Sequence, residues 1–101
     1  MKQIKFSKNW NNKLSCPVFT TIRHASFSYE VGKPVQIFLN DRHLFDAVVE
    51  KVSFFAFNSI PAEILMTDTG MKPEEAFKVF QKFYRDITPE SKFQILTLVR
   101  R

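Results

Sequence analysis

The sequence predicts an α+β domain, built as a small, mixed and mainly antiparallel β-barrel with covering helices. A hairpin signal, Asn40-Asp41-Arg42, joins two apolar strand patterns. The second of these patterns, residues 43–55, changes the face of its apolar alternation halfway, which is typical of the bulge that a closed sheet needs. Two helical patterns follow before a last apolar strand, so we expect the helices to cover one end of the sheet.

Length and composition are those of one small domain, which we expect to span residues 1–101. Twelve Phe residues predict an aromatic core, and the single cysteine, Cys16, excludes an internal disulfide or a multi-cysteine metal site. We expect no metal and no cofactor. The chain has no apolar run of about 18 residues and no apolar signal core near its start. We therefore expect a cytoplasmic protein that is not in a membrane.

The first element is predicted to be a strand over residues 2–6, where polar and apolar residues alternate. Ser7 is a candidate N-cap for a short helix over residues 8–14. Lys13 would lie beside the core-facing stripe of that helix. It would approach the following strand only if the helix packs against it.

Residues 16–24, Cys-Pro-Val-Phe-Thr-Thr-Ile-Arg-His, form the strand that carries the most chemistry. The alternation of side chains puts Phe19, Thr21 and Arg23 on one face, so a hydroxyl and a guanidinium stand side by side. A guanidinium is always charged and offers a planar fork of donors to carboxylates, phosphates or base edges. The alternative is structural: Arg23 pairs with an internal acid, and Thr21 is a β-branched filler.

The middle of the chain is predicted to be a loop, residues 24–32, followed by a strand over residues 35–39 and the hairpin. Phe27 and Tyr29 are aromatic anchors in that loop. Either ring could stack on a nucleobase, and the alternative is that both rings pack on the core.

Two helices and a strand complete the prediction. Ser59 and Pro61 indicate the start of a short helix over residues 60–66, and Thr67-Asp68-Thr69-Gly70 is expected to break it. A second helix begins at Pro73 and carries an aromatic stripe that we interpret as core. The last strand, residues 93–99, is apolar on both faces and should be central.

Charge is distributed unevenly along the chain. Residues 1–29 contain five basic and no acidic residues, whereas residues 30–101 contain ten of each. The whole net charge of +5 therefore lies in the segment that contains the Thr21 and Arg23 strand. Such an asymmetry favours an anionic partner such as nucleic acid, although a solvated basic face would also explain it.

Several segments follow one another in an order and spacing that suggest a known family: Trp10 to Leu14, Phe19-Thr20-Thr21-Ile22-Arg23, Tyr29 to Val35, Val48 to Val52, Phe83-Tyr84 and Phe93 to Leu96. In this order the chain resembles the ASCH family, a branch of the PUA-like β-barrel superfamily. The family's hallmark is Gly-x-Lys-x-x-Thr-x-Arg. Here Cys16 and Val18 stand at the Gly and Lys, and Thr21 and Arg23 keep the other two positions.

The resemblance implies a cleft that binds RNA or a nucleotide-like small molecule. We expect the Thr20–Arg23 strand to line this cleft and to give it a basic character. The ligand-binding candidates are Thr20, Thr21, Arg23, Lys13, Phe27, Tyr29 and Asp68.

The resemblance also implies an alternative, because some small members are amidohydrolases that act on acetylated cytidine. Thr21 would be the nucleophile, activated by a Lys and assisted by a Glu from the helical region. The sequence has neither residue at the expected place: Val18 replaces the Lys, and Thr69 beside Asp68 is nearest to the Glu. The question of an enzyme stays open and leans toward no.

Overall fold

The computed structural model describes residues 1–101 and contains one five-stranded sheet with the spatial order β1-β3-β4-β5-β2. The strands are β1 (Lys2–Phe6), β2 (Val18–His24), β3 (Pro34–Leu39), β4 (Arg42–Ala56) and β5 (Lys92–Arg100). Only β1 and β3 pair in parallel, and the other three pairs are antiparallel. The sheet is therefore mixed and mainly antiparallel, as the sequence predicts.

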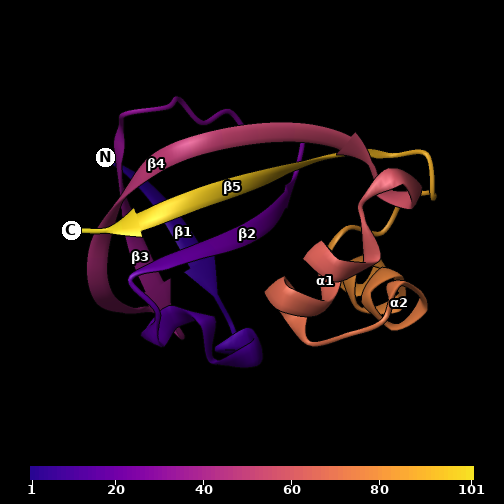
Figure 1. The fold of residues 1–101 in the computed structure, drawn as a ribbon, viewed down its shortest axis with the longest axis horizontal. Helices are drawn as coiled ribbons and strands as arrows, with labels where there is room; N and C mark the ends of the chain where they lie inside the picture. The colour runs from indigo at the N-terminus through magenta and orange to yellow at the C-terminus, as the bar shows by residue number, and fades with distance from the viewer.

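The sheet curls into a half-barrel (Figure 1). The long strands β4 and β5 arch over the molecule, β1 and β3 lie below the end of this arch that is away from helices α1 and α2, and β2 runs below it toward the helices and contacts α1. Strands β1 and β2 form the two edges of the sheet. The curl brings these edges to the same side of the molecule, where the polar residues of β2 are found.

The hairpin and the bulge of β4 confirm two sequence predictions. Asn40 and Asp41 both adopt left-handed backbone angles, with φ of 49° and 64°, as a two-residue hairpin turn requires. Opposite β5, the register passes from Val49 to Lys51, so Glu50 is the extra residue of a β-bulge. A bulge increases the local twist of a strand, which fits the curvature of β4.

Strand β5 is buried on both faces and lies between β4 and β2, which confirms its predicted central position. On one face, Leu96 and Leu98 belong to a core cluster under the curled sheet. On the other face, Phe93 and Ile95 belong to a second cluster formed with the helices. Two separate cores therefore stabilise the two faces of one strand.

The N-terminal helix differs from the prediction for residues 8–14. It is a 3-10 helix, η1 (Trp10–Ser15), and Ser7 does not cap it. Asn11 and Asn12 have φ of 53° and 57°, a left-handed conformation that Asn tolerates but that a regular α-helix does not contain. The side-chain oxygen of Asn9 accepts a hydrogen bond from the Leu14 backbone N–H at 2.9 Å and holds the kinked turn together.

The first C-terminal helix begins two residues later than predicted and continues through Thr69, so of the predicted break at residues 67–70 only Gly70 ends the helix. Helix α1 (Ala62–Thr69) follows a short 3-10 turn, η2 (Phe57–Ser59), and ends at Gly70, whose φ is 75°. Ser59 lies in η2 and caps nothing. The Thr69 hydroxyl donates to the Leu65 carbonyl at 2.7 Å, so this polar residue bonds within the helix instead of breaking it. Asp68 consequently stands on the last turn of α1.

Helix α2 (Pro73–Phe83) begins with proline in its first turn, as predicted. Ala76 and Phe80 are buried in the second cluster, but Phe83 is 57% exposed. The aromatic stripe of this helix is therefore core only in part. None of the helices has the length and apolar character that a membrane span requires.

Candidate functional site

A cavity of about 470 Å³ opens where η1, the edge strands β1 and β2, and helices α1 and α2 come together. Its polar lining includes Thr21 and Arg23 from β2, Asp68 from α1 and Lys13 from η1, all of which the sequence analysis singled out. The volume lies in the range of about 300–1,000 Å³ that is common for small-molecule sites. We regard this cavity as the candidate functional site.

Arg23 and Thr21 stand side by side in the cavity, as strand alternation predicts. Arg23 Nε donates to Thr21 Oγ1 at 3.2 Å, and Nη2 donates to the Lys5 carbonyl at 3.1 Å. The guanidinium carbon lies 4.7 Å from the centre of the Phe6 ring. The first bond fixes the head group on β2, and the second ties it to β1 across the open edge of the half-barrel.

The guanidinium of Arg23 has no acidic partner. The two ion pairs of the structure join Lys13 to Asp68 and His43 to Asp46. The structural alternative, in which Arg23 pairs with an internal acid, is therefore wrong. Nε and one hydrogen of Nη2 are bonded to neutral oxygens, so both hydrogens of Nη1 and the second hydrogen of Nη2 are left to a ligand, and no acidic side chain neutralises the positive charge.

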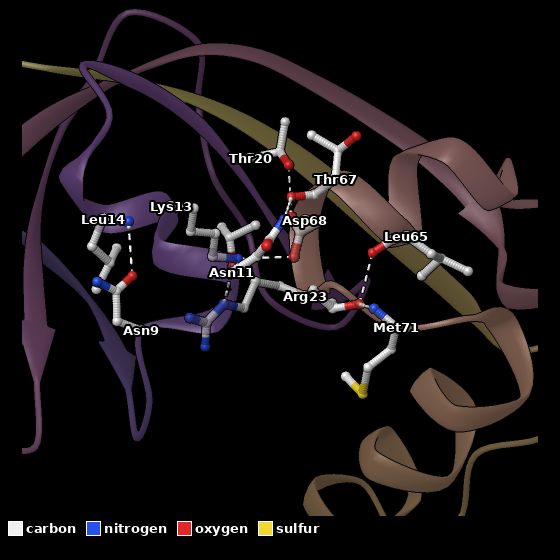
Figure 2. A network of polar contacts seen from close by, with 12 residues as sticks. Asn9, Asn11, Lys13, Leu14, Thr20, Arg23, Leu65, Thr67, Asp68 and Met71 are labelled. Atoms are coloured by element: carbon white, nitrogen blue, oxygen red, sulfur yellow. Dashed lines mark hydrogen bonds and ion pairs between the residues drawn. The ribbon is translucent and has the colours of Figure 1, made fainter.

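Lys13 and Asp68 form a buried ion pair at the same site. Lys13 Nζ donates to Asp68 Oδ1 at 2.8 Å, and the side chains are only 7% and 2% exposed. Thr20 Oγ1 donates to the other carboxylate oxygen at 2.6 Å. Figure 2 shows the carboxylate between the lysine of η1 and the threonine of β2. Thr20 and Asp68, both candidates from the sequence, are thus brought together at the β2 edge.

The pKa of Lys13 is lowered from its ordinary value, chiefly because burial disfavours the charged ammonium. The charge of Asp68 and its hydrogen bond act in the opposite direction, and the charge of Arg23 adds to the lowering. The ammonium also lies 5.1 Å from the centre of the Phe6 ring. The charged groups of Lys13 and Arg23 therefore both lie close to the Phe6 ring, and their like charges repel each other.

Asn11 explains how η1 comes to lie against the cavity. Its side-chain amide donates to the carbonyls of Thr67 at 3.0 Å and Met66 at 3.4 Å. Both carbonyls lie in the last turn of α1, where backbone acceptors run out of partners within the helix; the Met66 carbonyl also accepts a hydrogen bond from the Gly70 N–H at 2.8 Å. By binding them, Asn11 fixes η1 to α1 (Figure 2), and this attachment places Lys13 beside Asp68.

Three predicted ligand-binding residues, Thr20, Phe27 and Tyr29, do not line the cavity. Phe27 is 50% exposed and is absent from its lining, and its backbone carbonyl accepts a hydrogen bond from Gln94 Nε2 at 2.7 Å. Tyr29 lines a second cavity of about 350 Å³. Burial raises the pKa of Tyr29. Neither ring lines the cavity beside Thr21 and Arg23, because the loop carries both past the end of β2.

The aromatic part of the lining was missed by the sequence analysis. Trp10 reaches the cavity from η1, and Phe83 and Tyr84 reach it from the end of α2. The sequence did contain an indication of this wall: the aromatic stripe of α2 is one turn longer than a small core can bury. Nothing in the order of residues indicates that this turn lies opposite β2.

The lining contains three cations and two carboxylates: Lys5, Lys13, Arg23, Asp41 and Asp68. Because Lys13 and Asp68 compensate each other, the charges of Arg23 and Lys5 exceed that of Asp41 and give the lining its positive surplus. The cavity thus combines a donor-rich polar side with an aromatic side.

These features define a small α+β half-barrel domain with a ligand-sized cavity at its open edge. The chain matches no protein-family model and no curated protein. Its fold matches the crystal structure of protein EF3133 from Enterococcus faecalis V583, of the family DUF984, with a TM-score of 0.78. The match covers 100% of this chain and 76% of that chain at 10% sequence identity. The likeness concerns the fold alone, and together with the curled five-stranded sheet it confirms the α+β class and the mixed, mainly antiparallel sheet predicted from the sequence.

Proposed function

We propose that the protein is an RNA- or nucleotide-binding module of the ASCH family, which holds its ligand in the cavity beside Thr21 and Arg23. The observation that carries this proposal is an arginine head group without an acidic partner in a cavity of about 470 Å³. The planar fork of arginine suits phosphates and base edges. The retained Thr and Arg of the family's hallmark support the family assignment.

The aromatic side of the cavity supports the same class of ligand. Trp10, Phe83 and Tyr84 offer ring faces or edges to a planar group that enters beside Arg23. Stacking on aromatic side chains is the usual way in which proteins bind unpaired bases. In this proposal the base lies on the aromatic side, and the phosphate or a base edge lies against the guanidinium.

The proposal predicts a salt-dependent affinity for short single-stranded RNA. Titration of a fluorescent tetranucleotide by anisotropy should show binding at low salt that weakens steeply as salt is added, because phosphate contacts release counterions. Arg23→Lys keeps the charge but loses the fork. We expect this variant to bind about tenfold more weakly, since one well-placed bidentate contact contributes about 1–3 kcal/mol.

Arg101→Lys is the matched control. It makes the same substitution at an exposed arginine outside the cavity and should leave the affinity unchanged. Absence of binding by the wild-type protein at low salt would contradict the proposal. So would an equal loss of affinity in the two variants.

A second candidate function is amide hydrolysis, which one observation favours. Although Val18 replaces the family's lysine, Lys13 lines the same cavity as Thr21 and is paired with Asp68. A threonine nucleophile needs a base that accepts its proton. Thr21 Oγ1, however, receives its hydrogen bond from Arg23 Nε, and Lys13 Nζ bonds to Asp68. With no hydrogen bond between Lys13 and Thr21, binding is the better-supported function.

Incubation with acetylcytidine separates the two candidates. We expect the wild-type protein to release no more free cytidine than Thr21→Val does, measured by chromatography. Release of cytidine that is lost in both Thr21→Val and Lys13→Met would instead identify a hydrolase that uses Lys13 as its base.

A further inference from the structure

A second cavity lies outside the candidate site and has no role in the function proposed above. It measures about 350 Å³ and is lined by Lys2 at the start of β1, by Lys33 and Pro34 before β3, and by Tyr29 from the loop between β2 and β3. Glu30 adds one carboxylate to this lining. The cavity thus combines an aromatic ring with two lysines, which is the combination that a nucleotide requires.

Tyr29 lines the second cavity and lies within electrostatic reach of groups that line the first. Burial is the main cause of its raised pKa, and the charges of Arg23 and Tyr84, which line the first cavity, act on the same hydroxyl. Charges influence one another over about 10 Å at moderate salt. The phenolic oxygen of Tyr29 has no hydrogen-bond partner in the protein, so it is free to bond with a ligand.

Strand β1 runs from one cavity to the other. Lys2 lines the second cavity, and Lys5 and Phe6 line the first. Lys2 and Phe6 are four residues apart and share one face of the strand, about 13 Å apart at the usual rise. Two neighbouring nucleotides of an extended strand can cover this separation.

The face of Tyr29 is covered by a side chain that can move. The ammonium of Lys2 lies 5.1 Å from the ring centre, and Lys2 is exposed at the beginning of β1. A cation over an exposed ring is held more weakly than a stacked base. An incoming base can therefore replace the ammonium, which is then free to pair with the adjoining phosphate.

We propose that the second cavity binds the nucleotide next to the one held beside Arg23, so that a single RNA strand occupies both cavities. Its base stacks on Tyr29, and Lys2 and Lys33 contact its phosphates. This inference rests on the proposed function and extends it from a single nucleotide to a strand of at least two.

The test compares a ribonucleoside monophosphate with a tetranucleotide of the same base on wild-type and Tyr29→Leu proteins by titration calorimetry. Tyr29→Leu keeps an apolar side chain against the core but removes the aromatic face. We expect it to weaken tetranucleotide binding about tenfold and to leave monophosphate binding unchanged. Tyr29→Phe should retain most of the tetranucleotide affinity.

Phe27→Leu is the matched control, because it removes an exposed ring of the same loop that lines neither cavity, and it should change neither affinity. Should Tyr29→Leu fail to fold, Lys2→Gln, at an exposed position, must lower the salt dependence of tetranucleotide binding by about one counterion. A tetranucleotide that binds no better than the monophosphate, or equal effects of Tyr29→Leu on both ligands, would overturn the inference while leaving the first cavity as a nucleotide site. Absence of binding by both ligands would overturn both proposals.

Discussion

The residue with the least ordinary environment is Lys13, an ammonium that is nearly removed from water. Its attraction to Asp68 does not fully compensate for the lost hydration, so its pKa is lowered. Buried ion pairs contribute little net stability, but the loss of one partner leaves a charge that is costly to bury. Lys13 and Asp68 therefore act as a matched pair that fixes the position of η1 against α1.

The substitution Asp68→Asn tests the role of the Lys13–Asp68 pair, because it should change how the free energy of unfolding depends on pH. It leaves the ammonium of Lys13 buried without its counter-charge, so we expect the free energy of unfolding at neutral pH to fall by about 3 kcal/mol. Urea denaturation across the range from neutral to alkaline pH measures the change.

The sign of the pH effect follows from the lowered pKa of Lys13. Between the pKa of the folded state and the ordinary value of 10.5, the unfolded chain binds more protons, so stability rises with pH. Asp68 partly offsets the lowering of the Lys13 pKa by burial, so in Asp68→Asn this pKa should fall further. The rise of stability with pH is then larger in the variant, and the stability that the variant loses should shrink as the solution becomes alkaline. A loss that is the same at every pH would contradict this account. The double variant Lys13→Met with Asp68→Leu should recover most of the stability.

At the scale of elements, the strands were predictable because alternation is a local property. The face shared by Thr21 and Arg23 and the bulge of β4 follow from a period of two, and the hairpin at Asn40 follows from turn residues that adopt positive φ. Each of these features is found in the structure.

The helices were less predictable because their ends depend on distant partners. Helix α1 continues through Asp68 since Lys13 and Thr20, far away in sequence, satisfy its carboxylate. Likewise, η1 keeps a kinked backbone at Asn11 because that side chain binds the end of α1. Tertiary contacts override local preference in both places, and no pattern within either segment indicates them.

The walls of the first cavity were also predictable only in part, because some of them depend on tertiary packing. The sequence identified the polar residues of β2, but the aromatic wall comes from the end of α2, which packs opposite β2 only in the folded chain. Phe57 helps to position helix α2. Its ring meets those of Phe77, Phe80 and Phe93 at 5.1 to 5.4 Å between ring centres. This aromatic contact joins η2, α2 and β5 into one unit.

For the whole molecule, the decisive feature is that the half-barrel is open between β1 and β2. An arginine bridges this opening by bonding to Thr21 of its own strand and to the Lys5 carbonyl of the other edge. The two cavities take in opposite ends of β1, with Lys2 in the lining of one and Lys5 and Phe6 in the lining of the other. The basic N-terminal segment therefore supplies both the opening and the charges around it.

The single tryptophan of the chain, Trp10, lines the first cavity, so its indole N–H resonance in a heteronuclear NMR spectrum reports directly on occupancy of that cavity. On titration of the isotope-labelled protein with a single-stranded RNA tetranucleotide at low salt, the account predicts that this signal and the amide signals of Thr21 to His24 shift together and saturate. Shifts confined to residues away from β2 and η1, such as the hairpin at Asn40 to Arg42, or no shift at all, would contradict it.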